Sequence, residues 1–241
     1  MHPIKLNQFD VDAVLLDLDG TMVDTLGDFV AALHCMLADL PPPWRGQSVD
    51  RATIARLVGK GSENLVKSVL AHVAIAQGAP DLGANETLAQ VPGLLFEQAL
   101  ESYQRHYPSV NGRHATVYPG VREGLDQLQA QGLKMACVTN KPTRFAQALL
   151  QAKGLDGYFQ LTVGGDACAR KKPDPEPLVH ACAALGVHPL RTLMVGDSSN
   201  DAQAARGAGC PVVLVTYGYN HGQAIRSVDA DGFTDSLHGL V

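Results

Sequence analysis

Four short polar segments carry the side chains of this 241-residue chain that could perform chemistry together. Each one follows a run of apolar residues, at once or after a few positions. The segments are Asp17-Leu18-Asp19-Gly20-Thr21, Thr139-Asn140-Lys141, Lys171-Lys172-Pro173 and Gly196-Asp197-Ser198-Ser199-Asn200-Asp201. Carboxylates that are crowded together repel one another, and burial raises their pKa values unless a cation lies among them. Because Mg²⁺ prefers oxygen ligands, these residue types predict a magnesium site that acts on an anionic group.

Asp17 and Asp19 are two positions apart at the end of an apolar run, so we expect their side chains to face the same side of a crevice. One carboxylate can attack phosphorus and form an acyl phosphate, while a second can protonate the leaving oxygen and later deprotonate water. Gly20 permits a tight turn, and Thr21 with the surrounding backbone amides can hydrogen-bond an anion. The first segment therefore combines two reactive carboxylates with part of an anion site.

The second and third segments supply a hydroxyl and a positive charge. Thr139 can donate to a phosphoryl oxygen, and a lysine can balance the accumulated negative charge. Spacing alone leaves Lys171 and Lys172 as equal candidates. A single Asp at a strand end is more often a helix cap, and an isolated lysine is more often a solvated surface charge. Reactive groups at four strand ends together favour a functional site over these structural interpretations.

The apolar runs predict the strands that position these segments. Buried strands are expected at 11–16, 133–138, 159–163, 193–195 and 211–215, and amphipathic helices between the later strands at 121–131, 142–153, 175–185 and 200–208. This alternation predicts an α/β fold with a Rossmann-like parallel sheet covered by helices on both faces. Ligands bind beyond the carboxyl ends of such strands, where the polar segments stand.

More than a hundred residues separate the first two predicted strands, although a crossover helix needs only about a dozen. We expect helices in this stretch at 25–40, 48–58, 62–76 and 86–107, and the spacing of Thr25 and Asp28 predicts a capping box at the first of them. The sequence therefore predicts an all-helical domain at 25–110, inserted into an α/β core made of 1–24 and 111–241.

Composition narrows the class of protein and its partners. Hydrophobic residues make up 46% of the chain and charged residues 18%, with a net charge of -5, so we expect a packed core and no attraction to nucleic acid or anionic lipid. No apolar run approaches the ~20 residues of a membrane span, and no secretory signal is evident. The five scattered cysteines contain no Cys-x-x-Cys pair, which favours reduced thiols and a cytoplasmic location over a disulfide or zinc framework.

The four polar segments resemble, in order, the motifs of the haloacid dehalogenase-like superfamily of Mg²⁺-dependent phosphotransferases. In that family the first motif reads Asp-x-Asp-Gly-Thr, the second ends in Thr or Ser, the third supplies a Lys, and the fourth reads Gly-Asp-x-x-x-Asp. The chain is similar to the bacterial phosphoglycolate phosphatase branch in particular, at 118–121, 138–142, 172–175, 195–201 and 216–219. The resemblance covers essentially the whole chain and implies that the helical insertion is a cap over the active site.

The resemblance also implies a role for each matching residue. Asp17 would be the nucleophile and Asp19 the general acid/base, and the presence of this second acid favours phosphate chemistry over hydrolytic dehalogenation. Thr139 and the adjacent Asn140 would bind the phosphoryl group, and Lys172 would be the family lysine. The Mg²⁺ ion would be held by the acidic residues Asp17, Asp19, Asp197 and Asp201.

These roles lead us to expect a Mg²⁺-dependent phosphomonoesterase that hydrolyses 2-phosphoglycolate to glycolate and phosphate through an aspartyl-phosphate. Lys60, in Gly59-Lys60-Gly61, resembles a glycine-rich cap loop and could bind the carboxylate of this small phosphorylated metabolite; the alternative is an ordinary exposed loop lysine. The alternative interpretations are a phosphatase or phosphomutase that acts on a sugar phosphate, a pyrophosphatase, and a binding protein without turnover. The sequence carries no indication of the oligomeric state.

Overall fold

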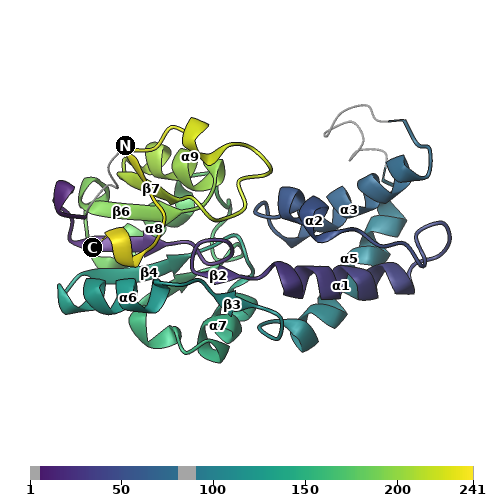
Figure 1. Ribbon diagram of the computed structural model, residues 1–241, viewed down its shortest axis with the longest axis horizontal. Helices are drawn as coiled ribbons and strands as arrows, with labels where there is room; N and C mark the ends of the chain where they lie inside the picture. Colours follow the sequence, from purple (N-terminus) through teal and green to yellow (C-terminus); the bar gives the residue numbers. More distant parts are fainter. Residues whose placement is uncertain (1–5, 81–90, 241) are drawn as a thin grey trace. The chain divides into compact units, whose positions relative to one another are not determined.

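The computed structural model describes residues 6–80 and 91–240. The chain divides into two compact units (Figure 1). The sheet unit comprises Met1–Asp24 and Thr116–Val241, and the helical unit comprises Thr25–Ala115. Within the described residues, no helix combines the length and the apolar content needed to cross a bilayer.

The sheet unit is built on six parallel strands in the order β5-β4-β1-β6-β7-β8. The strands are β1 (Ala13–Leu16), β4 (Lys134–Val138), β5 (Leu161–Val163), β6 (Thr192–Gly196), β7 (Val212–Val215) and β8 (Gly232–Thr234). The five strands expected from apolar runs are present, and the parallel α/β fold is confirmed. β8 was not expected, because its three residues Gly-Phe-Thr form no apolar run.

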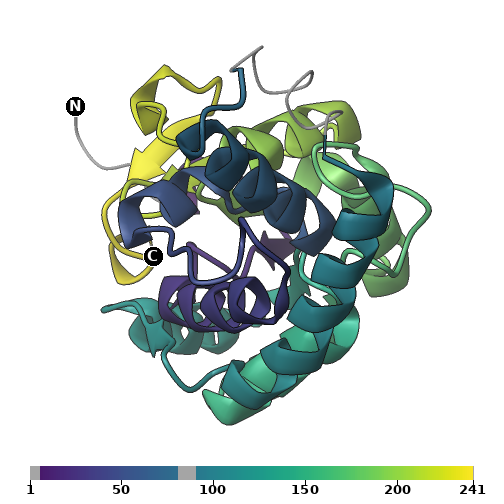
Figure 2. The same cartoon turned by 90° about the vertical axis from the view of Figure 1, so that its right-hand side faces the viewer.

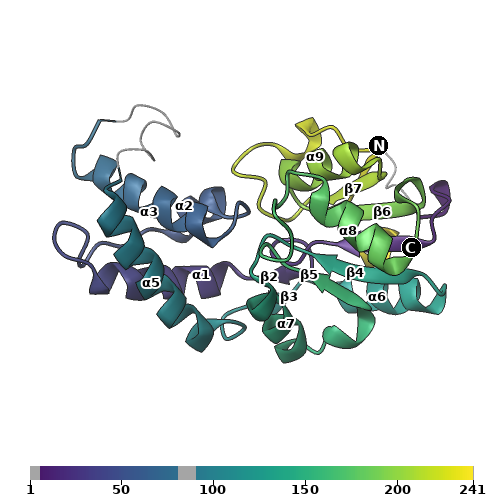
Figure 3. The same cartoon turned by 180° about the vertical axis from the view of Figure 1, so that it is seen from behind.

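Four helices cover the sheet: α6 (Val121–Ala130), α7 (Thr143–Ala152), α8 (Glu176–Leu185) and α9 (Ser199–Ala208). The buried side chains of α8 and α9 pack with alternate strand residues such as Leu15, Val138 and Met194. α8 is seen in front of the sheet in Figure 3, and right-handed crossovers place α6 and α7 on the opposite face (Figures 1 and 3). Burial on both faces explains why these strands read as continuous apolar runs.

The helical unit contains α1 (Leu26–Asp39), α2 (Arg51–Leu57), α3 (Ser62–Ala76) and α5 (Gly93–Val110). Figure 2 shows α5 (teal) running past α1 (purple), the helix with which it makes its most extensive contact. The rings of Phe29, Tyr103 and Tyr107 form the stack between them, with centroids 5.8 Å and 5.2 Å apart. α5 accounts for the helix expected at 86–107, of which residues 86–90 lie outside the described residues.

The helical unit ends at Ala115, whereas the sequence suggested 110. The Asp28 carboxylate of α1 accepts hydrogen bonds from the amides of Gly112 (2.6 Å) and His114 (2.7 Å), which fixes the chain after α5 to α1. The predicted capping box at Thr25 and Asp28 is therefore wrong. Thr25 is the N-cap residue, but its side chain makes no capping hydrogen bond, and the Asp28 carboxylate contacts the chain after α5 instead.

The two units are joined by two crossings of the chain that pair with each other. β2 (Val23–Asp24) precedes the helical unit and β3 (Thr116–Val117) follows it, and they form an antiparallel ribbon with Val23 opposite Val117. The two-residue strands are too short to leave a sequence pattern, so they could not be predicted from apolar runs.

Candidate active site

The carboxyl ends of three adjacent strands bring the polar segments to one edge of the sheet. β1 lies between β4 and β6, and Leu16 is in register with Cys137 on one side and with Val195 on the other. Asp17 therefore stands beside the segments that begin at Thr139 and Asp197. The chain passes from β1 to β4 and β5 on one side and returns to β6 on the other, which makes this edge the topological switch point where ligands bind in open α/β sheets.

Lys172 is the cation at the centre of the site. Its Nζ lies 2.9 Å from Asp17 Oδ1 and 2.7 Å from Asp201 Oδ1, and it donates to the Val138 carbonyl at 2.7 Å. The residue is only 3% exposed, so burial alone would lower its pKa, but the two carboxylates outweigh burial and raise the pKa above its usual range. Of the two neighbouring lysines, Lys172 is thus the one that lies among the acids.

Three carboxylates share this centre. Ligand atoms of Asp17, Asp197 and Asp201 all lie within 4.8 Å of one another. Burial raises the pKa of Asp17 to about 7; Lys172 lowers it and the Asp201 charge raises it. Burial, followed by the charges of Asp201 and Asp17, raises the pKa of Asp197 well above its usual value. Three acids with one lysine leave excess negative charge, and an all-oxygen donor set of this kind fits a hard divalent cation such as Mg²⁺.

Asp201 is held by the start of α9 as well as by Lys172. Its Oδ2 accepts from the amides of Asp197 (3.2 Å) and Ser198 (3.1 Å) and from the Ser198 hydroxyl (2.8 Å). This arrangement is a capping box, with Ser198 as the N-cap. The fourth segment therefore has both a structural and a chemical role, because the acid that caps the helix also positions the lysine.

Asp197 lies against two glycines that allow the backbone to approach it. The Tyr219 amide donates to Asp197 Oδ2 at 2.6 Å, and the Thr21 hydroxyl points to Oδ1 at 3.4 Å. A Cβ at Gly20, where φ is +88°, would lie 2.1 Å from Asp197 Oδ2, and a Cβ at Gly218 would lie 2.2 Å from its Cβ. Glycine at these positions is required by the close approach to Asp197. Thr21, expected to bind the substrate anion, lies within reach of Asp197 here.

Asp19 departs from the expectation that it faces the same way as Asp17. Its carboxylate is outside the three-acid cluster found in the described part of the chain and pairs with Lys141, whose Nζ lies 3.0 Å from Oδ1 and 3.3 Å from Oδ2. Strand alternation does not apply at this position, because β1 ends at Leu16 and the next residues form a turn. In this turn the Leu18 carbonyl accepts from the amides of Met22 and Val23. The position of the Asp19 carboxylate does not support its predicted role as a side-chain metal ligand.

Lys141 is a site residue that was not predicted from the sequence. It is buried although it is a lysine, which is unusual without a charged partner. Its place in the segment after β4, two positions beyond Thr139, was the available signal. Thr139 is buried beside it, and its hydroxyl oxygen accepts from the Lys141 amide at 3.2 Å. The Asn140 side chain donates to the Lys172 carbonyl at 2.8 Å and so links the second and third segments.

Lys60 belongs to the helical unit, in the bend between α2 and α3. It is exposed and stands between Gly59 and Gly61, which have φ values of +105° and +87°. The backbone there is a glycine-dependent turn, as expected for this loop. The contact of Lys60 with a substrate carboxylate stays a prediction.

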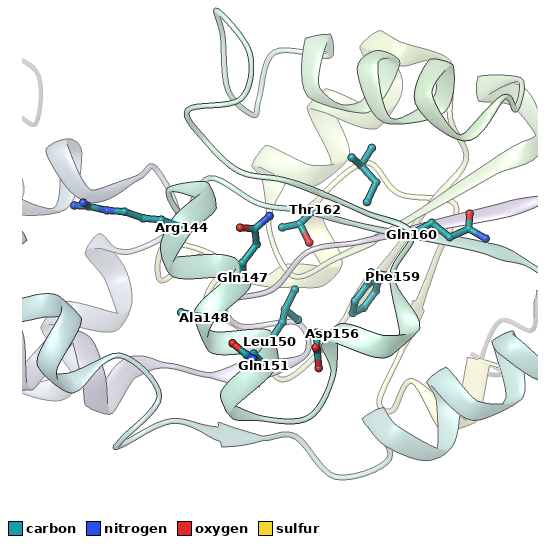
Figure 4. A pocket seen from close by; sticks show the side chains of 10 residues that line it. Arg144, Gln147, Ala148, Leu150, Gln151, Asp156, Phe159, Gln160 and Thr162 are labelled. Carbon is teal, nitrogen blue, oxygen red and sulfur yellow. The ribbon is translucent and has the colours of Figure 1, made fainter.

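A surface depression of about 630 Å³ lies away from these residues, between α7, the short 3₁₀ turn Asp156–Tyr158 and β5 (Figure 4). Its polar side chains include those of Arg144, Gln147 and Asp156, and Phe159 is one of its apolar ones. None of the site residues predicted from the sequence lines it.

Comparisons with known proteins identify the family of this chain. The haloacid dehalogenase-like hydrolase family matches residues 11–209. The chain is 42% identical to a phosphoglycolate phosphatase of Thiobacillus denitrificans, over 94% of this chain and 92% of that one, and 44% identical to a plasmid-encoded phosphoglycolate phosphatase of Cupriavidus necator, over 95% and 90%. The crystal structure of a predicted phosphoglycolate phosphatase from Haemophilus somnus 129PT superposes with a TM-score of 0.82 at 31% identity, over 95% of this chain and 96% of that one. With the family matched over most of its length and its acidic residues gathered at the switch point, the chain belongs to the haloacid dehalogenase-like hydrolases.

Proposed function

We propose that the protein hydrolyses 2-phosphoglycolate to glycolate and phosphate, with Mg²⁺ as its cofactor. The observation that carries the chemistry is the cluster of Asp17, Asp197 and Asp201 around Lys172 at the carboxyl ends of β1 and β6. The substrate is suggested by the similar proteins named phosphoglycolate phosphatase, which align with nearly the whole chain. Mg²⁺ would be held by these carboxylates and, when bound, supplies positive charge that stabilises the phosphoryl oxygens.

Asp17 is the nucleophile in this proposal. Burial favours its neutral form, and Lys172, 2.9 Å away, favours the ionised form that can attack. A carboxylate oxygen forms a bond to phosphorus as the bond from phosphorus to the glycolate oxygen breaks, and an aspartyl-phosphate results. Lys172 and Thr139 offset the charge on the equatorial oxygens of the phosphoryl group.

Asp19 moves the protons. It donates a proton to the departing glycolate oxygen and then takes one from the water that attacks the aspartyl-phosphate, which releases phosphate and restores Asp17. The contact of both Asp19 oxygens with the Lys141 ammonium fixes the orientation of this carboxyl group outside the three-acid cluster. The helical unit, with Lys60 on an exposed glycine loop, is the proposed cap that binds the substrate carboxylate.

A panel of phosphorylated compounds tests the proposal. Purified protein is assayed for phosphate release from 2-phosphoglycolate, a hexose phosphate, pyrophosphate and an aryl phosphate, with Mg²⁺ or with EDTA. We expect the highest kcat/KM on 2-phosphoglycolate and no turnover in EDTA. Asp17→Asn should lower kcat by roughly 10³-fold or more, as loss of a catalytic nucleophile does, while Asp229→Asn, at a side chain that is 84% exposed, should leave it unchanged.

Each alternative has its own outcome in this panel. A hexose phosphate or pyrophosphate that is hydrolysed far better than 2-phosphoglycolate would replace the substrate and keep the chemistry. Absence of phosphate release from every compound of the panel in Mg²⁺ would indicate a binding protein. Ordinary turnover by Asp17→Asn would exclude Asp17 as the nucleophile.

A further inference from the structure

Tyr219, in the segment after β7, makes contacts in two directions. Its backbone amide donates to Asp197 Oδ2 at 2.6 Å. Its hydroxyl donates to Asp24 Oδ1 at 2.5 Å and also lies within hydrogen-bond range of the Tyr118 side chain. A bond from a phenol to a carboxylate is charge-assisted and therefore short and directional. One residue thus connects the three-acid cluster with two other segments of the sheet unit.

Those two segments are the crossings of the chain to and from the helical unit. Asp24 is the last residue of β2, and Tyr118 directly follows β3. The Tyr118 amide donates to the Met22 carbonyl at 3.1 Å, so the two crossings are also held to each other. The hydroxyl of Tyr219 is anchored where both crossings meet, and this anchor belongs to the sheet unit alone.

A neighbouring tyrosine reinforces the same anchor. The Tyr217 hydroxyl donates to the Thr21 carbonyl at 2.9 Å, and its ring centroid lies 4.4 Å from that of Tyr118. Gly218, between the two tyrosines, carries no side chain, which allows the backbone to reach Asp197. The two tyrosine hydroxyls of the segment 217–219 therefore bond to residues 21 and 24, while its backbone contacts Asp197 of the acid cluster.

We propose that Tyr219 is a positioning residue for Asp197: its hydroxyl anchors it on the crossings, and its amide orients the carboxylate for the cation. The Tyr219 amide, 2.6 Å from Asp197 Oδ2, is a much closer donor than the Thr21 hydroxyl, 3.4 Å from Oδ1, so it is the contact that orients this carboxylate. Mutation of a residue that hydrogen-bonds a metal ligand commonly lowers metal affinity or activity by about 10–100-fold. The inference rests on the proposed function in that it takes Asp197 as a ligand of Mg²⁺.

The test measures the Mg²⁺ dissociation constant by calorimetry without substrate, together with kcat and KM for phosphate release. Tyr219→Phe keeps the ring and the amide and removes the anchor. We expect its Mg²⁺ dissociation constant to rise on the order of 10-fold and its kcat to fall, with a smaller change in KM. Asp24→Ala should give the same loss, and Asp24→Asn, which keeps an oxygen acceptor, should restore part of it.

Tyr158→Phe is the matched control, because its hydroxyl also donates to an aspartate, Asp126 Oδ1 at 2.6 Å, at an exposed position of the same unit. It should bind Mg²⁺ like the wild type. The double variant Tyr219→Phe/Asp24→Ala should be no weaker than either single variant, since both remove one bond.

Two results would overturn the inference: a Mg²⁺ affinity of Tyr219→Phe equal to that of Tyr158→Phe, or losses in the double variant that multiply. Failure of the proposed function is distinguishable from both. A wild-type protein that binds Mg²⁺ but hydrolyses no ester would refute the proposed function, while the calorimetric comparison would still decide the role of Tyr219.

Discussion

Replacing Lys172 by methionine tests the charge balance on which the candidate site depends. Methionine has a similar length and no charge, so the variant retains most of the packing and removes the ammonium that contacts Asp17 and Asp201. Three clustered carboxylates would then face one another without their lysine. We expect Lys172→Met to destabilise the sheet unit at neutral pH in the absence of divalent cations.

The size of the effect follows from burial. Removing one partner of a buried ion pair costs about 3–5 kcal/mol, because the remaining charge is left uncompensated. At about 2–4 °C per kcal/mol for a chain of this size, the midpoint of thermal unfolding should fall on the order of 10 °C. Lys134→Met is the control: its Nζ donates to the Leu185 carbonyl at 2.6 Å, and it lies outside the acid cluster.

The pH dependence separates a charge effect from a packing effect. The pKa of Asp17 is raised to about 7 in the folded protein, above its unfolded value, so this acid favours the folded state at low pH and opposes it as the pH rises through 7. Without Lys172 the pKa rises further. The difference in melting temperature between the variant and the wild type should therefore be largest at pH 8 and smaller at pH 5, where Asp17 is protonated.

Calorimetric melting in a chelator at pH 5 and pH 8 measures this difference. If Lys172→Met and the wild type have the same midpoint of thermal unfolding at pH 8, the lysine does not stabilise the cluster. If the difference is the same at both pH values, the loss comes from packing or from the bond to the Val138 carbonyl rather than from charge. Either result would refute the reasoning about the site.

Two further predictions concern other parts of the chain. Gly218→Ala places a Cβ 2.2 Å from Asp197 Cβ, so kcat/KM should fall at least about 10-fold. Gly157→Ala, which has no atom within 4 Å of the added Cβ, should have the activity of the wild type. Equal activity of the two variants would show that the close approach to Asp197 is dispensable. In the helical unit, hydrogen bonds from His106 and other α5 side chains hold the pKa of Asp39 well below its usual range. The stabilisation from these hydrogen bonds is present above about pH 4 and is lost as the pH falls further. In thermal melts, Asp39→Asn should therefore lower the free energy of unfolding by roughly 1 kcal/mol at pH 7 and by less at pH 3. An equal loss of stability at both pH values would contradict this.

Much of the sheet could be predicted from the sequence because its central strands are buried on both faces. Runs such as the one ending at Leu16 contain only apolar residues, and this signal does not depend on what the strand pairs with. β8 and the β2–β3 ribbon gave no such signal. They have three residues or fewer per strand, and they exist because neighbours distant in the sequence offer hydrogen bonds to them.

The residues of the site were predictable where strand ends decide their place. Asp17 and Asp197 follow β1 and β6 directly, so a correct strand assignment brings them together. The direction of Asp19 was not predictable, because a turn replaces strand alternation after Leu16. The role of Tyr219 depends on contacts with Asp197 and with Asp24, the second of which is 195 positions away in the chain.

The contacts of the three acids indicate which of them are available to a cation. In the described part of the chain, Asp201 accepts from Lys172 through one oxygen and from three donors at the start of α9 through the other. Asp197 has the Tyr219 amide and a long contact with a hydroxyl, and Asp17 has the ion pair with Lys172. Since both oxygens of Asp201 are already bonded within the chain, we expect Asp17 and Asp197 to be the main ligands of the proposed cation and Asp201 to be a further one. A cation between Asp17 and Asp197 would lower the pKa of both and leave Asp17 ionised, which is the state that a nucleophile requires.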